Sequence, residues 1–262
     1  MAKTIPEKTV SFEFIFDRRN ESITLPRQKN KSLLRSQLRN ILTIGHLSNQ
    51  IVRYTDPDFT KPRLVVFDLD STLVSGEFMG VMSDLVEDEE KRDEILRLTE
   101  EAITKDIDWK TNYRARVAML KGMPTELMIS YFPFMRISRG AKELIKWLHA
   151  NEIKCAIITG AWSVYAQYIA DYLGIEECHA TDWSVKNGRL TGRISGRLLH
   201  PLAKQRILKE IAQREGIEPS EIVVVADGYN DLEMMCYAKC SFMVNALHPK
   251  ALSLTKIIKV LQ

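Results

Sequence analysis

The sequence has 262 residues, of which 45% are hydrophobic and 27% charged, and its formal net charge at pH 7 is +3. These values are typical of a globular protein with a substantial core and exclude a chain too polar to fold. No apolar run approaches the roughly 20 residues that span a bilayer, and the start, MAKTIPEKTV, lacks a secretory signal. The small net charge gives no ground to expect nucleic-acid binding or a membrane partner.

The first 62 residues are predicted to form an extension ahead of the main domain. The phenylalanines in residues 11–25 alternate with polar residues and lead into a polar turn, which predicts a hairpin. Apolar residues at helical spacing then predict a helix over 31–52. Residues 1–63 carry 12 Lys and Arg against 6 Asp and Glu. Such a basic segment could contact another subunit in a homodimer, an acidic partner or nucleic acid, although a solvated face is the simpler interpretation.

Two aspartates follow an apolar strand in the middle of the sequence. Val65, Val66 and Phe67 predict a short buried strand, and Asp68 and Asp70 come at its end. Side chains two residues apart on an extended backbone point to the same side, so both carboxylates can face one site. Carboxylates at a buried strand end are costly unless a cation or a positive group meets them.

Downstream of these aspartates, a helical segment precedes a regular alternation of strands and helices. Residues 76–137 are predicted to form a small helical cap, and residues 63–75 and 138–262 the catalytic core. The predicted core elements are a helix over 141–149, a strand over 155–158, a helix over 163–173, a hairpin turning at Asn187-Gly188, a helix over 202–215 and a strand over 222–226. This alternation predicts an α/β fold with a doubly wound parallel sheet, whose site lies at the carboxyl edge. The four cysteines form no C-x-x-C pair, which favours reduced thiols in a cytoplasmic protein.

Polar residues follow three of the predicted core strands. They are Asp68 and Asp70, Thr159 with Gly160, and Asp227 with Asn230 and Asp231. Because parallel strands end at one edge of the sheet, we expect these groups to share one crevice. Up to three carboxylates there suit Mg²⁺, which prefers oxygen ligands. Lys204, at the start of the preceding helix, lies within reach of the third strand.

The ordered motifs VVFDLDST, IITG, a lysine and ADGYND resemble those of the haloacid dehalogenase superfamily of phosphotransferases. The resemblance implies that Asp68 is the nucleophile and Asp70 the general acid and base. It implies that Thr159 and Lys204 bind the phosphoryl oxygens, with Gly160 beside them. It further implies that Asp68, Asp227 and the backbone carbonyl of Asp70 hold Mg²⁺, that Asp231 orients Lys204 and that Asn230 lines the pocket.

Within the cap the sequence is similar to the phosphoserine phosphatase family. That similarity implies that Glu77 binds the substrate ammonium, that Arg116 binds its carboxylate and that Trp109 forms an aromatic wall. A carboxylate and a guanidinium on opposite sides of a pocket suit a zwitterionic amino acid. Each residue also has a plainer interpretation: Glu77 as a first-turn helix residue, Arg116 as a solvated charge and Trp109 as cap core.

Four residues beside the predicted pocket depart from the family pattern and leave the substrate open. Ala161 and Trp162 replace the usual Gly and Phe, and Ala226 and Tyr229 replace the usual Gly and Ala. The first expectation is Mg²⁺-dependent hydrolysis of O-phospho-L-serine through an aspartyl-phosphate. The alternatives are hydrolysis or transfer of the phosphoryl group of another small phosphomonoester, such as phosphocholine, phosphoethanolamine or a sugar phosphate, and a non-catalytic phosphate-binding protein of the same fold.

Overall fold

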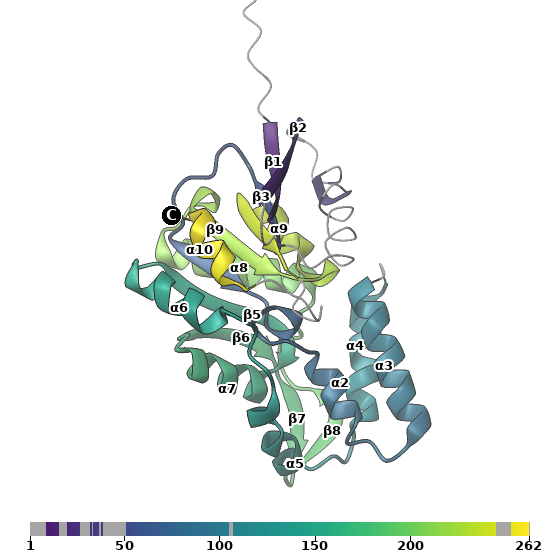
Figure 1. The fold of residues 1–262 in the computed structure, drawn as a ribbon. Helices are drawn as coiled ribbons and strands as arrows, with labels where there is room; N and C mark the ends of the chain where they lie inside the picture. The colour runs from purple at the N-terminus through teal and green to yellow at the C-terminus, as the bar shows by residue number, and fades with distance from the viewer. Residues whose placement is uncertain are drawn as a thin grey trace, which may run out of the picture.

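A computed structural model describes residues 9–15, 20–26, 32, 34–36, 38, 51–104, 107–244 and 253–261. Eight strands form its central sheet in the order β2-β1-β3-β10-β9-β4-β5-β6. They are β1 (Thr9–Ile15), β2 (Asn20–Pro26), β3 (Ile51–Thr55), β4 (Leu64–Phe67), β5 (Lys154–Trp162), β6 (Glu177–Thr181), β9 (Ile222–Ala226) and β10 (Cys240–Met243). Figure 1 shows β1 and β2 at one end of the molecule. The strands from β10 to β6 in this order are parallel, and β3, β1 and β2 extend the sheet antiparallel. The predicted α/β class with a mostly parallel sheet is confirmed.

Helices cover both faces of the parallel strands. The core helices are α6 (Ala141–Ala150), α7 (Ser163–Leu173), α8 (Pro201–Glu215), α9 (Leu232–Tyr237) and α10 (Thr255–Leu261). Val65 and Phe67 of β4 belong to the apolar cluster that contains residues of α6 and α7. Leu64 and Val66 belong to the cluster that contains residues of α8. This burial on two faces explains why the parallel strands are continuous apolar runs and do not alternate with polar residues.

The N-terminal segment joins the central sheet. The predicted hairpin is confirmed as β1 and β2, and the described residues from 32 to 38 are helical as expected. The predicted helix is wrong at its end: Ile51 and Val52 begin the strand β3, which lies between β1 and β10. The β-branched and aromatic residues of IVRYT favour a strand, and Ile51, Val52 and Tyr54 are buried there. Residues 39–50 of the predicted helix lie outside the described residues.

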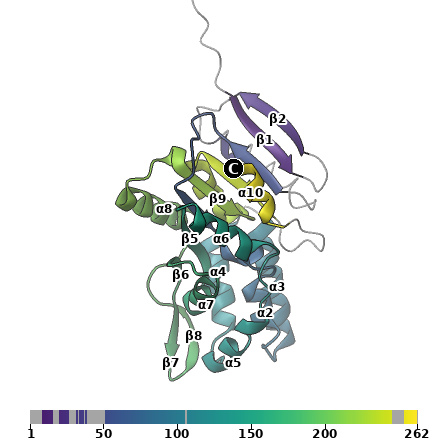
Figure 2. The same cartoon turned by 60° about the vertical axis from the view of Figure 1, so that its left-hand side comes forward.

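A second group of elements gathers at one end of the molecule (Figure 2). It contains α2 (Phe78–Ser83), α3 (Glu89–Thr104), α4 (Trp109–Met119), α5 (Thr125–Ser130) and the hairpin of β7 (Trp183–Lys186) and β8 (Arg189–Ile194). The backbone joins the hairpin to the helices: Gly122 N donates to Leu190 O at 2.8 Å, and Leu190 N donates to Met123 O at 3.0 Å. Asn187 and Gly188 have φ values of 51° and 71°, which are the positive angles of the predicted two-residue turn.

No helix in the described part of the chain is long and apolar enough to cross a membrane. All four cysteines lie in that part, none of them in a disulfide, with Cys155 and Cys240 buried. The cysteines therefore add no covalent constraint to the fold.

Candidate active site

A buried lysine bonds two aspartates at the carboxyl edge of the sheet. Asp68 follows β4, Lys204 lies in the first turn of α8, and Asp231 ends the short turn after β9. Lys204 Nζ donates to Asp68 Oδ1 at 2.9 Å and to Asp231 Oδ1 at 2.8 Å. The Lys204 and Asp231 side chains are fully buried, and that of Asp68 is 5% exposed. Three segments distant in sequence thus meet through one ammonium group, as the strand-end argument predicts.

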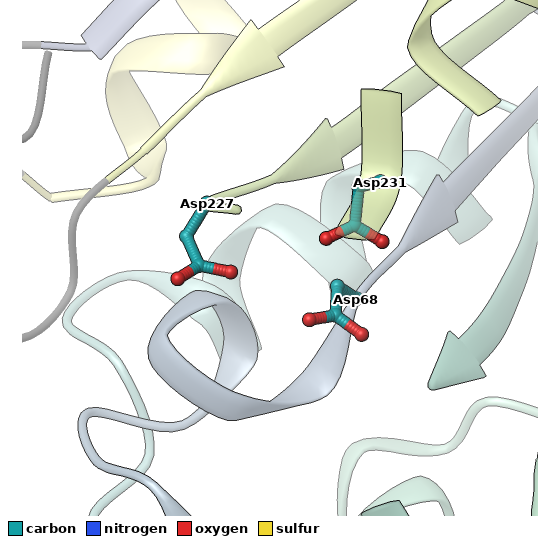
Figure 3. Close-up of side chains that lie close together, drawn as sticks. All are labelled: Asp68, Asp227 and Asp231. Atoms are coloured by element: carbon teal, nitrogen blue, oxygen red, sulfur yellow. The ribbon is translucent and has the colours of Figure 1, made fainter. Parts of the chain in front are cut away.

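Asp227 adds a third carboxylate to this group. One carboxylate oxygen from each of Asp68, Asp227 and Asp231 lies within 4.8 Å of the other two, and the three side chains face one another (Figure 3). The cluster thus also includes the carboxylate of Asp231. The sequence motif predicted a contact of Asp231 with Lys204 only. One lysine charge cannot neutralise three buried carboxylates, so the donor set fits a divalent cation with a preference for oxygen ligands.

Burial places these charges under electrostatic strain. The pKa of Asp227 is raised well above its usual range by burial, then by Asp68, Glu77 and Asp231. Burial and the charge of Asp68 raise the pKa of Asp231 to about 7, although Lys204 opposes the shift. Burial lowers the pKa of Lys204, but Asp231 and Asp68 outweigh it and the net pKa is raised. Lys204 therefore stays a cation, and its single positive charge does not balance the charges of the three carboxylates.

Asp70 lies in the tight turn Leu69–Leu73 that follows Asp68. The turn is kinked at Asp70, with ψ of 142°, and at Ser71, with φ of 55°. Asp70 lines the pocket, and its buried Oδ1 has no hydrogen-bond partner among the described residues. Burial raises the pKa of Asp70 well above its usual range, as do Glu77 and Asp68, whereas a hydrogen bond from the Phe78 backbone lowers it. An acceptor oxygen without a partner beside the pocket is available for proton exchange with a ligand.

Thr159 and Gly160 lie near the end of β5, which is longer than the predicted strand and continues to Trp162. Both line the same pocket as Asp68 and Asp70, and the Thr159 hydroxyl accepts a hydrogen bond from Ala161 N at 3.1 Å. A Cβ atom on Gly160 would lie 3.1 Å from Trp109 Cζ2 and 3.3 Å from Trp109 Cη2. Glycine at this position therefore lets the Trp109 ring pack on the backbone beside Thr159.

Glu77 and Arg116 line this pocket from the predicted cap, each with partners of its own. Glu77 accepts a hydrogen bond from the Ser71 hydroxyl. Arg116 Nε donates to Asn112 Oδ1 at 2.9 Å, and its Nη1 lies 3.3 Å from Thr99 Oγ1.

Burial shifts both charges toward their neutral forms. It raises the pKa of Glu77 to about 7 and lowers that of Arg116. The two groups influence each other electrostatically, and no hydrogen bond joins them in the described structure. They form a separated pair of opposite charges in the pocket that Asp68 and Asp227 also line.

The remaining predicted residues surround this arrangement. Asn230 lines the pocket, and its amide can donate to Asp231 Oδ2 at 2.9 Å while its oxygen accepts from Lys204 Nζ at 3.1 Å. Of the residues that depart from the motif, Ala161 lines the pocket and Trp162 stacks on Trp183, with ring centroids 5.6 Å apart. Ala226 is buried at the end of β9.

Among the residues that sequence reasoning missed are Thr99, Tyr113 and Trp183, which line the pocket, and Asn112, which bonds Arg116. Asn112 precedes Arg116 by four residues on one helix, and this spacing is a signal that predicts a contact between the two side chains. Tyr113 lies on the same helix, four residues after Trp109 and three before Arg116, and this spacing likewise predicts contacts with both. Thr99 and Trp183 lie on other elements, and nothing in their local sequence links them to Arg116 or to the motifs.

Comparisons with known proteins agree with this fold. A family model for haloacid dehalogenase-like hydrolases matches residues 65–235. The chain is 38% identical to a phosphoserine phosphatase of Archaeoglobus fulgidus over 70% of this chain and 53% of that protein. It is 33% identical to a phosphoserine phosphatase of Methanocaldococcus jannaschii over 66% of this chain and 81% of that protein. The chain thus spans about half the length of the first of these relatives.

Solved structures give the same relationship. A phospho-aspartyl intermediate analogue of phosphoserine phosphatase superposes with a TM-score of 0.67 and 30% identity, over 78% of this chain and 100% of that one. A substrate-bound phosphoserine phosphatase complex gives 0.66, again at 30% identity and with the same coverage. Fold and site thus define an α/β protein with a carboxylate–lysine centre at the carboxyl edge of its sheet. The chain belongs to the family of haloacid dehalogenase-like hydrolases.

Proposed function

We propose that this chain hydrolyses O-phospho-L-serine to serine and phosphate through an aspartyl-phosphate. The observation that carries the proposal is one pocket with two kinds of group: Asp68, which Lys204 bonds from behind the pocket wall, and the separated charges of Glu77 and Arg116. A phosphomonoester with a zwitterionic head complements both. The named activity of the curated relatives supports the same reaction.

The core residues supply the chemistry. A carboxylate oxygen of Asp68 attacks phosphorus, the P–O bond to the serine oxygen breaks, and Asp70 gives that oxygen its proton. Asp70 then takes a proton from water as the water attacks phosphorus, and the bond to Asp68 breaks to release phosphate. Covalent catalysis replaces one difficult displacement with two easier ones. Lys204, Thr159 and Gly160 hold the phosphoryl oxygens in line with Asp68.

A divalent cation, which we propose to be Mg²⁺, would complete the core. Asp68, Asp227 and the backbone carbonyl of Asp70 would hold it, with Asp231 beside them. When bound, the cation neutralises phosphoryl and carboxylate charge. Asp231 and Asn230 meanwhile keep Lys204 directed at the site.

The cap residues supply recognition. Glu77 binds the substrate ammonium and Arg116 its carboxylate, while the ring of Trp109 covers the aliphatic part. Asn112 and Thr99 support this role because they hold Arg116 in place. Both charges are disfavoured by burial, so a ligand that carries the two opposite charges at matching positions relieves the cost of both.

The division of the chain remains a proposal of the same kind. We propose an extension over 1–62, a cap over 76–137 and a core over 63–75 and 138–262. A homodimer through the extension and a cytoplasmic location also remain predictions. Size-exclusion chromatography with light scattering tests the predicted homodimer, and a monomer at micromolar concentration would contradict that prediction.

Phosphate release with Mg²⁺ across a panel of phosphomonoesters tests the proposed function. The panel contains phosphoserine, phosphoethanolamine, phosphocholine and a sugar phosphate, and the control is Asp68→Asn. We expect phosphoserine to have the highest kcat/KM and Asp68→Asn to be inactive on all four. Equal values for phosphoserine and phosphoethanolamine would contradict the proposed substrate. Equal inactivity of wild type and variant would favour a phosphate-binding protein.

A further inference from the structure

One hydroxyl group connects three segments that border the pocket. Tyr113, in α4 of the cap, donates a hydrogen bond from its hydroxyl to the backbone carbonyl of Gly160 near the end of β5. The same oxygen accepts a hydrogen bond at 2.9 Å from Nε1 of Trp183, at the start of β7. Tyr113 is 4% exposed, and burial raises the pKa of its hydroxyl to about 12, so the donor proton is retained at neutral pH.

The Gly160 carbonyl, which Tyr113 bonds, lies in a part of β5 where pairing with both neighbouring strands is interrupted. The parallel ladder between β4 and β5 ends at the pair Phe67 and Ile157. On the other side, the pairing of β5 with β6 is irregular between Ile158 and Trp162. The peptide of Gly160 therefore extends beyond one ladder and lies within a break in the other, and glycine has the widest backbone freedom.

Trp162, which departs from the family motif, belongs to the same assembly. Its ring stacks on Trp183 with centroids 5.6 Å apart and an interplanar angle of 10°, and it is 2% exposed. The Trp162 ring therefore packs against the indole of Trp183, which donates to Tyr113. Trp162 itself does not line the pocket.

The ring of Tyr113 also underlies the groups proposed to bind the substrate. Trp109 stacks on it with centroids 4.7 Å apart, and the guanidinium carbon of Arg116 lies 5.4 Å from its centroid. The hydroxyl thus touches the phosphoryl-binding segment while the ring touches the cap residues.

We propose that Tyr113 is a positioning residue whose hydroxyl fixes the Gly160 peptide, and with it the segment Thr159–Gly160, in the orientation that receives a phosphoryl group. This inference rests on the proposed function for the role of Thr159 and Gly160. It adds that the cap acts on phosphate binding itself, through Tyr113, and not only on recognition of the amino acid part.

Calorimetric titration of inorganic phosphate with Mg²⁺ tests the inference, because phosphate lacks the groups that Glu77 and Arg116 would bind. Tyr113→Phe keeps the ring and removes only the hydroxyl. We expect its Kd for phosphate to rise about tenfold, the effect of losing one buried hydrogen bond. KM for phosphoserine should rise by the same factor. Trp183→Phe, which keeps an aromatic ring and loses the donor, should give a smaller rise in the same direction.

Two comparison variants separate this role from others. Arg116→Ala should raise KM for phosphoserine and leave the Kd of phosphate unchanged. Tyr168→Phe, on α7 with a side chain 37% exposed, should change neither value.

An unchanged phosphate Kd in Tyr113→Phe would overturn the inference, even with a lowered Tm, because the role would then be structural alone. An equal loss in Tyr168→Phe would also overturn it. A weakened phosphate affinity in Tyr113→Phe, together with a wild type that does not hydrolyse phosphoserine, would support the inference and contradict only the proposed substrate. A wild type that binds no phosphate would overturn both.

Discussion

The two sides of the pocket handle charge differently. At the sheet edge, Lys204 bonds Asp68 and Asp231 directly, and these opposite charges meet before any ligand arrives. On the cap side, Glu77 and Arg116 are each bonded to neutral groups, Ser71 for the one and Asn112 for the other. At the sheet edge the opposite charges are therefore fixed in direct contact, whereas on the cap side they are held apart.

Under the proposed function, this difference separates chemistry from recognition. A phosphoryl group reacts in the same way whatever alcohol carries it, so the groups around it need a fixed geometry. An amino acid is recognised by the distance between its two charges, so the groups that bind it must not pair with each other. Changes at the sheet edge should therefore affect every substrate, and changes on the cap side should affect substrates selectively.

Asp68→Asn should have the largest effect. The amide is a poor nucleophile, so we expect kcat to fall by about 10⁴ or more for every phosphomonoester. Phosphate release under saturating substrate measures it. Asp93→Asn, on the exposed face of α3, is the matched control and should retain wild-type activity. Residual activity above a tenth of wild type would mean that Asp68 is not the nucleophile.

Lys204→Met should impair both stability and catalysis. Removal of one partner from a buried ion pair costs about 3–5 kcal/mol because the remaining charges lose their compensation. We also expect kcat to fall by about 10³, since the phosphoryl charge loses a fixed cation. Denaturant unfolding and phosphate release measure the two effects, with the exposed Lys209→Met on the same helix as control. Unchanged unfolding would contradict the account of the sheet edge.

Glu77→Gln should change how the free energy of unfolding depends on pH, because Glu77 is one of the two separated charges on the cap side. The pKa of Glu77 rises from 4.5 to about 7 on folding, so its contribution to stability is full below pH 4.5 and is lost as pH rises through 7. The neutral variant should match wild type at pH 4.5 and exceed it at pH 8 by at most about 3 kcal/mol. Urea unfolding of the ligand-free protein across this range measures the difference. A difference independent of pH would show that Glu77 is not strained.

Gly160→Ala should have the smallest effect, at the junction of the two sides. The new Cβ would lie 3.1 Å from Trp109, and such overpacking costs about 1–3 kcal/mol. We expect kcat/KM to fall about tenfold for all phosphomonoesters. Trp109→Phe in the same chain removes the two ring atoms concerned and should restore part of the loss. Failure of this rescue would mean that the contact with Trp109 is not the cause.

The sheet edge was largely predictable because its signals are local. A strand that ends in polar residues places them at the carboxyl edge, and this alone brings Asp68, Thr159 and Asp227 to one pocket. The strand β9, with its continuous apolar run, and the turn at Asn187-Gly188 were predicted because their signals are also local. The failure at Ile51 and Val52 has a tertiary cause: their apolar pattern suits a helix or a strand, and pairing with β1 and β10 decides between the two.

The cap side was harder to predict because its contacts join distant segments. Tyr113 and Trp183 are 70 residues apart, and neither carries a motif. The position of Arg116 in a helix does not reveal that Thr99, on another helix, approaches its guanidinium. The carboxylate set shows the same limit, since only the folded chain reveals that Asp231 offers an oxygen within 4.8 Å of both Asp68 and Asp227.

The most direct test of the central claim is the ratio of kcat/KM for phosphoserine to that for phosphoethanolamine, in wild type and in Arg116→Ala. Phosphoethanolamine keeps the ammonium and lacks the carboxylate. We predict a ratio of about 100 in wild type, a value typical of one charged contact, which falls to near 1 in the variant. Arg114→Ala, exposed on the same helix, should keep the wild-type ratio. An equal loss on both substrates in Arg116→Ala would contradict the division between chemistry at the sheet edge and recognition at the cap.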